Sequence, residues 1–192
     1  MALRCFIAVR IPDEIKQSIG RVIDALSITG ADVKWVNPAN IHVTLKFLGN
    51  TDEQLVGPIS AVLEKKISSY APFYIKIAGV GSFPDRKRPR VIWIGIRDSG
   101  ELKSLQQDID IEMIRFGYAA EDRPFSPHLT IGRVRSGKKS MEMLKALESF
   151  NERDFGQIEI KGVALMKSEL KSTGAEYLSL AEIFIKGRKH GE

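Results

Sequence analysis

The sequence predicts a fold that mixes β-strands with α-helices in two copies of one unit. Short apolar, β-prone segments alternate along the chain with stretches whose apolar residues recur at helical spacing. The segment Phe6 to Arg10 (FIAVR) resembles Trp93 to Arg97 (WIGIR) 87 positions later, and His42 matches His128 86 positions later. Two β-rich units too small to bury separate cores should pack about a pseudo-two-fold axis, with a cleft between equivalent strands. We predict a single bilobal domain, 1–192, with halves at about 1–85 and 86–186.

The first half is expected to begin with a strand over Leu3 to Val9 and a helix after Pro12. A short strand over 33–36, a turn at 37–40 and a strand over 41–48 should follow, the last ended by Gly49-Asn50. Thr51 with Gln54 has the spacing of a capping box, which predicts the start of a second helix. A strand over Phe73 to Val80 completes this half.

The second half opens with a basic loop over 84–89 and a strand over 90–97. A helix with the apolar stripe Leu102 to Phe116 should stop at Gly117. A strand from His128 to Val134, a short helix over 141–150 and two long strands around 171–174 follow. Residues 187–192, which include His190, are predicted to form a flexible tail with no function.

Composition excludes several classes of protein. The 192 residues are 43% hydrophobic and 28% charged, which does not fit disordered, collagen-like or coiled-coil chains. No apolar run approaches the roughly 20 residues that span a bilayer, so we expect no membrane partner. Cys5 is the one cysteine, which excludes an internal disulfide and a cysteine-based zinc site and favours a cytoplasmic location. With only three histidines as well, few ligands remain for any other transition-metal site.

The same short motif occurs once in each half. His42-Val43-Thr44-Leu45 and His128-Leu129-Thr130-Ile131 both read His-x-Thr-aliphatic. Side chains alternate along a strand, so each histidine should share a face with its threonine while the aliphatic residues enter the core. A single such histidine would more often be structural, but a pair at matched positions indicates a shared site.

Two imidazoles and two hydroxyls suit phosphodiester chemistry. One ring can take a proton from an attacking oxygen while the other gives a proton to the leaving oxygen, and histidine does both near neutral pH. The hydroxyls of Thr44 and Thr130 can donate hydrogen bonds to phosphate oxygens. The sequence therefore predicts a site that brackets one phosphorus atom.

Several cations lie near these motifs in the sequence. Lys46 should share the His42 face if its strand is regular, whereas Arg133 reaches the His128 face only if Gly132 allows a bulge. The loop with Arg86, Lys87, Arg88 and Arg90 has the charge expected for contact with a nucleic-acid chain, although such runs more often form solvated loops.

The paired motifs resemble those of the two-histidine phosphoesterase superfamily. Similarity extends over nearly the whole chain and is strongest to the RNA 2′,3′-cyclic phosphodiesterase branch, historically called 2′-5′ RNA ligase. The segments that carry it are Arg4 to Val9, His42 to Gly49, Pro89 to Trp93 and Pro127 to Arg133.

The resemblance implies a bilobal α+β fold with two antiparallel sheets flanking a central cleft and helices on the outer faces. It also implies hydrolysis of RNA 2′,3′-cyclic phosphate ends to 2′-phosphate ends without metal or cofactor. We expect the protein to be a monomer. His42 would be the general acid and His128 the general base, although these roles could be exchanged. Thr44, Thr130 and Arg133 would bind the phosphate.

Other functions stay open at this point. With an RNA 5′-hydroxyl in place of water, the same site could join tRNA halves through a weak, reversible 2′-5′ ligation. The substrate could instead be a small cyclic nucleotide or ADP-ribose cyclic phosphate. A non-catalytic module that binds RNA ends is the third alternative.

Overall fold

The computed structural model describes residues 2–97, 100–171 and 174–187, which form nine β-strands and four α-helices. The strands make two sheets in which every neighbouring pair is antiparallel. The first sheet has the order β3 (His42–Asp52), β1 (Ala2–Arg10), β8 (Gly162–Lys171), β9 (Gly174–Phe184). The second has the order β2 (Val33–Trp35), β6 (His128–Val134), β5 (Val91–Arg97), β4 (Phe73–Phe83), β7 (Asp154–Ile160). This is the predicted α+β fold.

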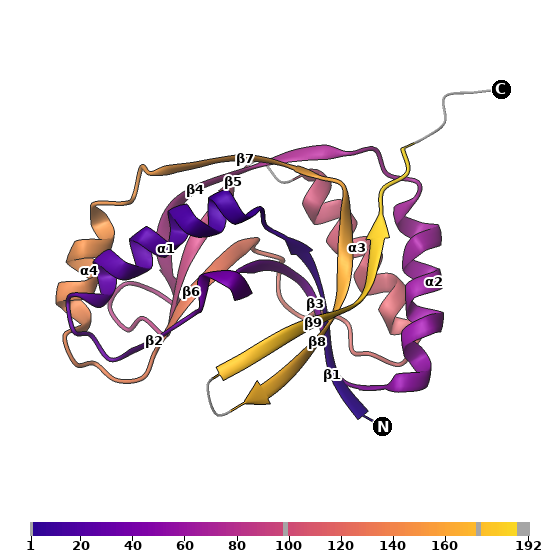
Figure 1. The fold of residues 1–192 in the computed structure, drawn as a ribbon, viewed down its shortest axis with the longest axis horizontal. Coiled ribbons are helices and arrows are strands. Elements are labelled where there is room, and N and C mark those ends of the chain that lie inside the picture. Colours follow the sequence, from indigo (N-terminus) through magenta and orange to yellow (C-terminus); the bar gives the residue numbers. More distant parts are fainter. Residues whose placement is uncertain (1, 98–99, 172–173, 188–192) are drawn as a thin grey trace.

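Two pairs of helices cover the sheets. Helices α1 (Asp13–Ser27) and α4 (Ser140–Glu148) contact each other and pack on β7 and β4 of the second sheet. Helices α2 (Val56–Ile67) and α3 (Gly100–Ile114) contact each other and pack on β9 and β3 of the first sheet. Figure 1 shows the pairs at opposite ends of the molecule, with the strands between them. Short 3-10 helices, η1 (Pro38–Asn40) and η2 (Glu53–Leu55), flank β3.

The two sheets exchange elements between the halves of the sequence. Strand β4 and helix α1 come from the first half but belong to the second sheet and its helical layer. Strands β8 and β9, at the end of the chain, complete the first sheet. The equivalent pairs β1/β3 and β5/β6 nevertheless occupy matching neighbouring positions, as a duplicated unit requires.

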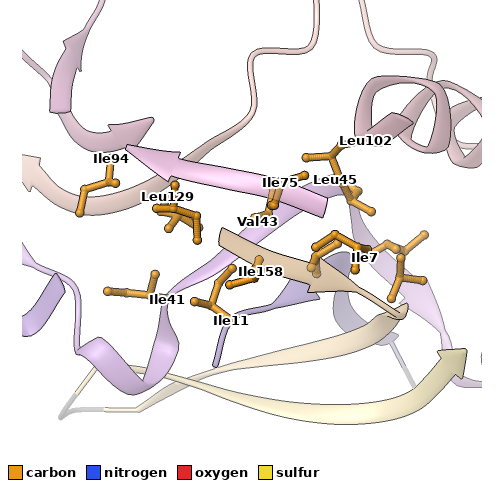
Figure 2. Close-up of a cluster of buried hydrophobic side chains, with 14 of the residues drawn as sticks. Ile7, Ile11, Ile41, Val43, Leu45, Ile75, Ile94, Leu102, Leu129 and Ile158 are labelled. Atoms are coloured by element: carbon orange, nitrogen blue, oxygen red, sulfur yellow. The ribbon is translucent and has the colours of Figure 1, made fainter. Parts of the chain in front are cut away.

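One hydrophobic core connects both sheets. Figure 2 shows Ile7, Val43 and Leu45 of the first sheet in the same buried cluster as Ile94 and Leu129 of the second. All five are at most 3% exposed. Because the core faces of the sheets are sealed in this way, polar strand residues on the opposite faces are left for function.

Two predictions about the elements are wrong, and one strand was not predicted. Strand β3 continues past Gly49 to Asp52, so Thr51 is a strand residue and not a helix cap. The carboxylate of Asp52 caps the short helix η2 instead and accepts a hydrogen bond from the Gln54 amide at 3.1 Å. Strand β7 is absent from the elements that the sequence pattern predicts.

The tail predicted over 187–192, with His190, lies outside the described residues except for Gly187. Among the helices that the structure describes, none is long and apolar enough to cross a membrane.

Candidate active site

The two His-x-Thr motifs open two strands that meet between the sheets. His42 is the first residue of β3 and His128 is the first residue of β6. These strands belong to different sheets, yet their Cα atoms approach within 8 Å. All four motif side chains, those of His42, Thr44, His128 and Thr130, are half-buried, whereas the intervening Val43 and Leu129 are fully buried. The predicted alternation of faces over each His-x-Thr segment is confirmed.

A one-residue bulge follows each motif. On β1, Ala8 pairs with Thr44 and Ile7 with Lys46, so Leu45 is the extra residue. The second sheet repeats this: Trp93 pairs with Thr130 and Ile92 with Gly132, so Ile131 is extra. A bulge inverts the alternation beyond it. Phe47 and Arg133, which are equivalent in the repeat, therefore lie on the histidine faces of their sheets.

Each histidine ring is held by the same backbone contact. Nδ1 of His42 is 2.7 Å from the carbonyl oxygen of Asn40, and Nδ1 of His128 is 2.7 Å from that of Ser126. A carbonyl only accepts, so Nδ1 carries the proton in both rings. The neutral ring then has its lone pair on Nε2, and the charged ring has its second N–H there. Each Nε2 is thus the nitrogen that can take or give a proton.

Aromatic side chains pack against both imidazoles. The His42 ring lies 4.8 Å from the Phe6 ring and 5.2 Å from that of Tyr177, the latter edge-on. The His128 ring lies edge-on to Phe83 at 5.0 Å. These ring contacts and the Nδ1–carbonyl contact together hold each imidazole in one orientation.

Sequence reasoning missed two residues that support His42. Tyr177 is far away in the sequence, and no local pattern links it to the motif. The Asn40 side chain donates a 2.7 Å hydrogen bond to the Ala175 carbonyl of β9, which ties the residue bonded to His42 to the outer strand of the sheet. The repeat contained a signal for Asn40, since it is equivalent to Ser126, which has the same contact with the other histidine.

Burial lowers the pKa of His42 from its ordinary value of 6.5, and the nearby charge of Lys16 lowers it further; the bond to Asn40 opposes both. We therefore expect the His42 ring protons to titrate below pH 6.5 in an NMR titration of the protein without ligand. Because the pKa of His42 is lower in the folded state than in the unfolded state, its neutral form stabilises the fold above pH 6.5. This contribution is lost as pH falls toward the folded-state pKa. A midpoint above 6.5 would contradict the expected burial effect.

Lys46 does not share the His42 face, and the prediction that placed it there is wrong. The bulge at Leu45 turns it to the core side, where it is 3% exposed. Its ammonium group donates to Oδ1 of Asp110 at 2.5 Å and to the Ala119 carbonyl at 2.6 Å, and it lies 3.3 Å from Glu121. Lys46 thus connects β3 to α3 and to the loop before β6. Its ammonium group is therefore not available to contact RNA.

Arg133 lies on the Thr130 face because the bulge at Ile131, just before Gly132, inverts the alternation. This is the condition under which the sequence placed Arg133 on that face. In the basic loop, the Arg86 guanidinium donates hydrogen bonds to Glu148, the last residue of α4, at 3.4 Å and to the Asn151 side chain at 2.9 Å. Lys87, Arg88 and Arg90 are exposed.

An Asx turn shapes this loop. The carboxylate of Asp85 accepts hydrogen bonds from the amides of Lys87 and Arg88 at 2.7 and 2.9 Å. The loop leaves β4 at Phe83, the residue that packs on His128, so its cations begin next to the second motif. Across the parts of the chain that the structure describes, no three His, Cys, Asp or Glu side chains gather in a way that could hold a metal ion.

Comparison with known proteins identifies a family model that matches twice. The model described as LigT-like phosphoesterase matches residues 9–93 and again 94–177, so its repeat coincides with the duplication. A protein of Methanothermobacter thermautotrophicus named RNA 2′,3′-cyclic phosphodiesterase is 33% identical over 184 residues, 96% of this chain and 99% of its own. A Methanocaldococcus jannaschii protein of the same name is 34% identical over 180 residues, covering 94% and 99%.

Solved structures show the same fold. The protein TT0787 of Thermus thermophilus has a TM-score of 0.81 at 26% identity and covers 97% of this chain and 100% of its own. E. coli LigT complexed with 3′-AMP has a TM-score of 0.76 at 21% identity, covering 96% and 99%. The arrangement of the two sheets is therefore shared over the full length of these proteins.

Proposed function

Because the chain belongs to the LigT-like phosphoesterase family, we propose that it hydrolyses RNA 2′,3′-cyclic phosphate ends to 2′-phosphate ends. The observation that carries the proposal is the matched pair of histidines, each with Nδ1 on a carbonyl two residues earlier and Nε2 left for proton transfer. The names of the two archaeal relatives support the substrate class. No step of the proposed reaction calls on a metal ion or cofactor.

The reaction needs one base and one acid. In our proposal Nε2 of His128 takes a proton from water as the water oxygen attacks phosphorus. The bond from phosphorus to the 3′ oxygen breaks, and Nε2–H of His42 gives that oxygen its proton. The product keeps the phosphate on the 2′ oxygen, and one water is consumed for each ring opened.

The other residues on these faces bind the substrate. Thr44 and Thr130 donate hydrogen bonds to the non-bridging oxygens, where charge builds as water attacks. Arg133 adds a planar cation on the same face as Thr130. Phe47, 65% exposed on the His42 face, offers an aromatic surface for the terminal base.

Ligation is the weaker part of the proposal. Replacing water with the 5′-hydroxyl of a second RNA, such as a tRNA half, would open the same cyclic ester and form a 2′-5′ linkage. The half-buried motif residues stay accessible to water, which competes with any RNA 5′-hydroxyl for the same strained cyclic ester. Hydrolysis should therefore dominate.

The test is to incubate the purified protein, in excess EDTA, with an oligoribonucleotide that ends in a 2′,3′-cyclic phosphate. We expect a 2′-phosphate product, resolved from the 3′ isomer by chromatography. Turnover of nucleoside or ADP-ribose cyclic phosphates but not of the oligonucleotide would replace the RNA substrate with a small one. RNA binding without turnover would instead identify a binding module.

A further inference from the structure

Two cations face each other across β2 and β6 beside the second motif. Lys34 pairs directly with Arg133, so their side chains project from the same face, which is also the face of Thr130. Both are exposed. Like charges directly opposite each other on neighbouring strands destabilise a sheet. Among the described residues, neither cation has an ion-pair partner to offset that cost.

Other strand lysines of this protein are neutralised locally. Lys76 on β4 pairs with Asp154 on β7 at 2.8 Å, and Lys167 pairs with Glu169 on the same strand at 2.6 Å. Lys171 pairs with Glu176 across β8 and β9. Lys34 therefore differs from the other strand lysines, and an external anion would relieve its repulsion from Arg133.

The pair also breaks the symmetry of the duplicated unit. β2 extends the second sheet beyond β6, while β3, the equivalent of β6, is itself the edge of the first sheet. The residue equivalent to Arg133 is Phe47, so the first sheet has an aromatic side chain where the second has a cation. The two sides of the site thus suit different parts of one substrate, a base beside His42 and phosphates beside His128.

The position of Lys34 fits a second phosphate better than the reacting one. Neighbouring strands are about 4.8 Å apart, so Lys34 on β2 lies one strand farther from β5 than Thr130 and Arg133 do. A group already held at Thr130 and Arg133 would leave Lys34 to contact the next negative charge along the chain.

We propose that Lys34, one strand beyond Arg133, forms a subsite for the phosphodiester that links the terminal nucleotide of the RNA to its 5′ neighbour. The inference rests on the proposed function and adds to it a preference for substrates of two or more nucleotides. A nucleoside 2′,3′-cyclic phosphate has no such linkage and gains nothing from Lys34.

The test compares a dinucleotide that ends in a 2′,3′-cyclic phosphate with the corresponding nucleoside 2′,3′-cyclic phosphate. For Lys34→Gln we expect kcat/KM to fall about fivefold for the dinucleotide, as one partly exposed charge contact allows, and to stay the same for the nucleoside. The slope of log kcat/KM against log salt should become shallower by about 0.7 for the dinucleotide. Lys34→Arg should retain the dinucleotide rate, and Lys34→Glu should lower it further.

Lys103→Gln is the matched control, because Lys103 is exposed on helix α3, on the helical side of the first sheet, and its loss changes net charge equally. It should change neither rate. Equal effects of Lys34→Gln on both substrates, or no effect on either, would overturn the subsite while leaving the proposed function standing. Failure of the unmodified protein to hydrolyse either substrate would overturn both.

Discussion

Replacing either His42 or His128 with alanine is expected to lower kcat/KM for a 2′,3′-cyclic phosphate RNA by about 10²-fold or more. Each substitution removes one of the two proton-transfer groups of the proposed reaction. Circular dichroism and thermal unfolding should show that both variants stay folded, because the rings are half-buried and lie on the side of each sheet away from the core. Retention of activity in both would contradict acid/base catalysis and favour a binding module.

A substrate with sulfur in place of the bridging 3′ oxygen separates the two roles. A thiolate leaves without a proton, so loss of the general acid should matter little for this substrate. We expect His42→Ala to recover most of its activity with the sulfur substrate and His128→Ala to stay inactive. Rescue of His128→Ala instead would mean that the two histidines have exchanged roles. The comparison is informative because burial lowers the pKa of His42 and so favours its neutral ring, the form of a base, before substrate binds.

The second large effect is expected on stability. Lys46→Met should lower the free energy of unfolding by about 3–5 kcal/mol, the usual cost of breaking a buried pair and leaving one charge behind. The charge left is that of Asp110, whose side chain is 15% exposed. This carboxylate also accepts a hydrogen bond from the Glu121 amide at 3.2 Å. Urea unfolding of the variant and of an exposed control, Lys103→Met, measures the difference.

A second substitution tests the cause of that loss. Adding Asp110→Asn to Lys46→Met removes the unpaired carboxylate, so we expect part of the stability to return. No recovery would mean that Lys46 acts through packing of its alkyl chain instead of its charge. In either variant the loop between α3 and β6 keeps the 3.0 Å bond that Tyr118 donates to Thr51 on β3, but loses the anchor that Lys46 provides.

Periodicity is sufficient for most of the fold because the core-facing residues follow it closely. The stripe of α2 is buried at Ile59, Leu63 and Ile67 as its helical spacing requires. Strand β7 escapes prediction because Gly156, at φ +113°, sits at a register irregularity, so its buried residues Phe155 and Ile158 are three apart instead of two. A segment with that spacing resembles neither a regular strand nor a helix.

Backbone irregularities also limit what the sequence predicts about the candidate site. The two histidines and threonines precede the bulges, and their faces follow simple alternation. Lys46 comes after a bulge, and a bulge is specified by the partner strand, which a local pattern does not contain. Gly132, the equivalent of Lys46, is the one local sign that the backbone departs from regular pairing there. Comparing the two copies position by position would have predicted the Lys46 inversion from that of Arg133.

The exchange of strands between the sheets bears on how such a chain could arise. A polypeptide that ended at residue 85 would contain β1 without β8, and β4 without β5 and β7, so its strands would have open edges in both sheets. Open edges recruit strands from other molecules. A single-copy ancestor of this fold is therefore expected to have been a homodimer in which each subunit completed the other's sheets. Gene fusion would then have turned an intermolecular interface into the interior of one protein and freed Phe47 and Arg133 to diverge.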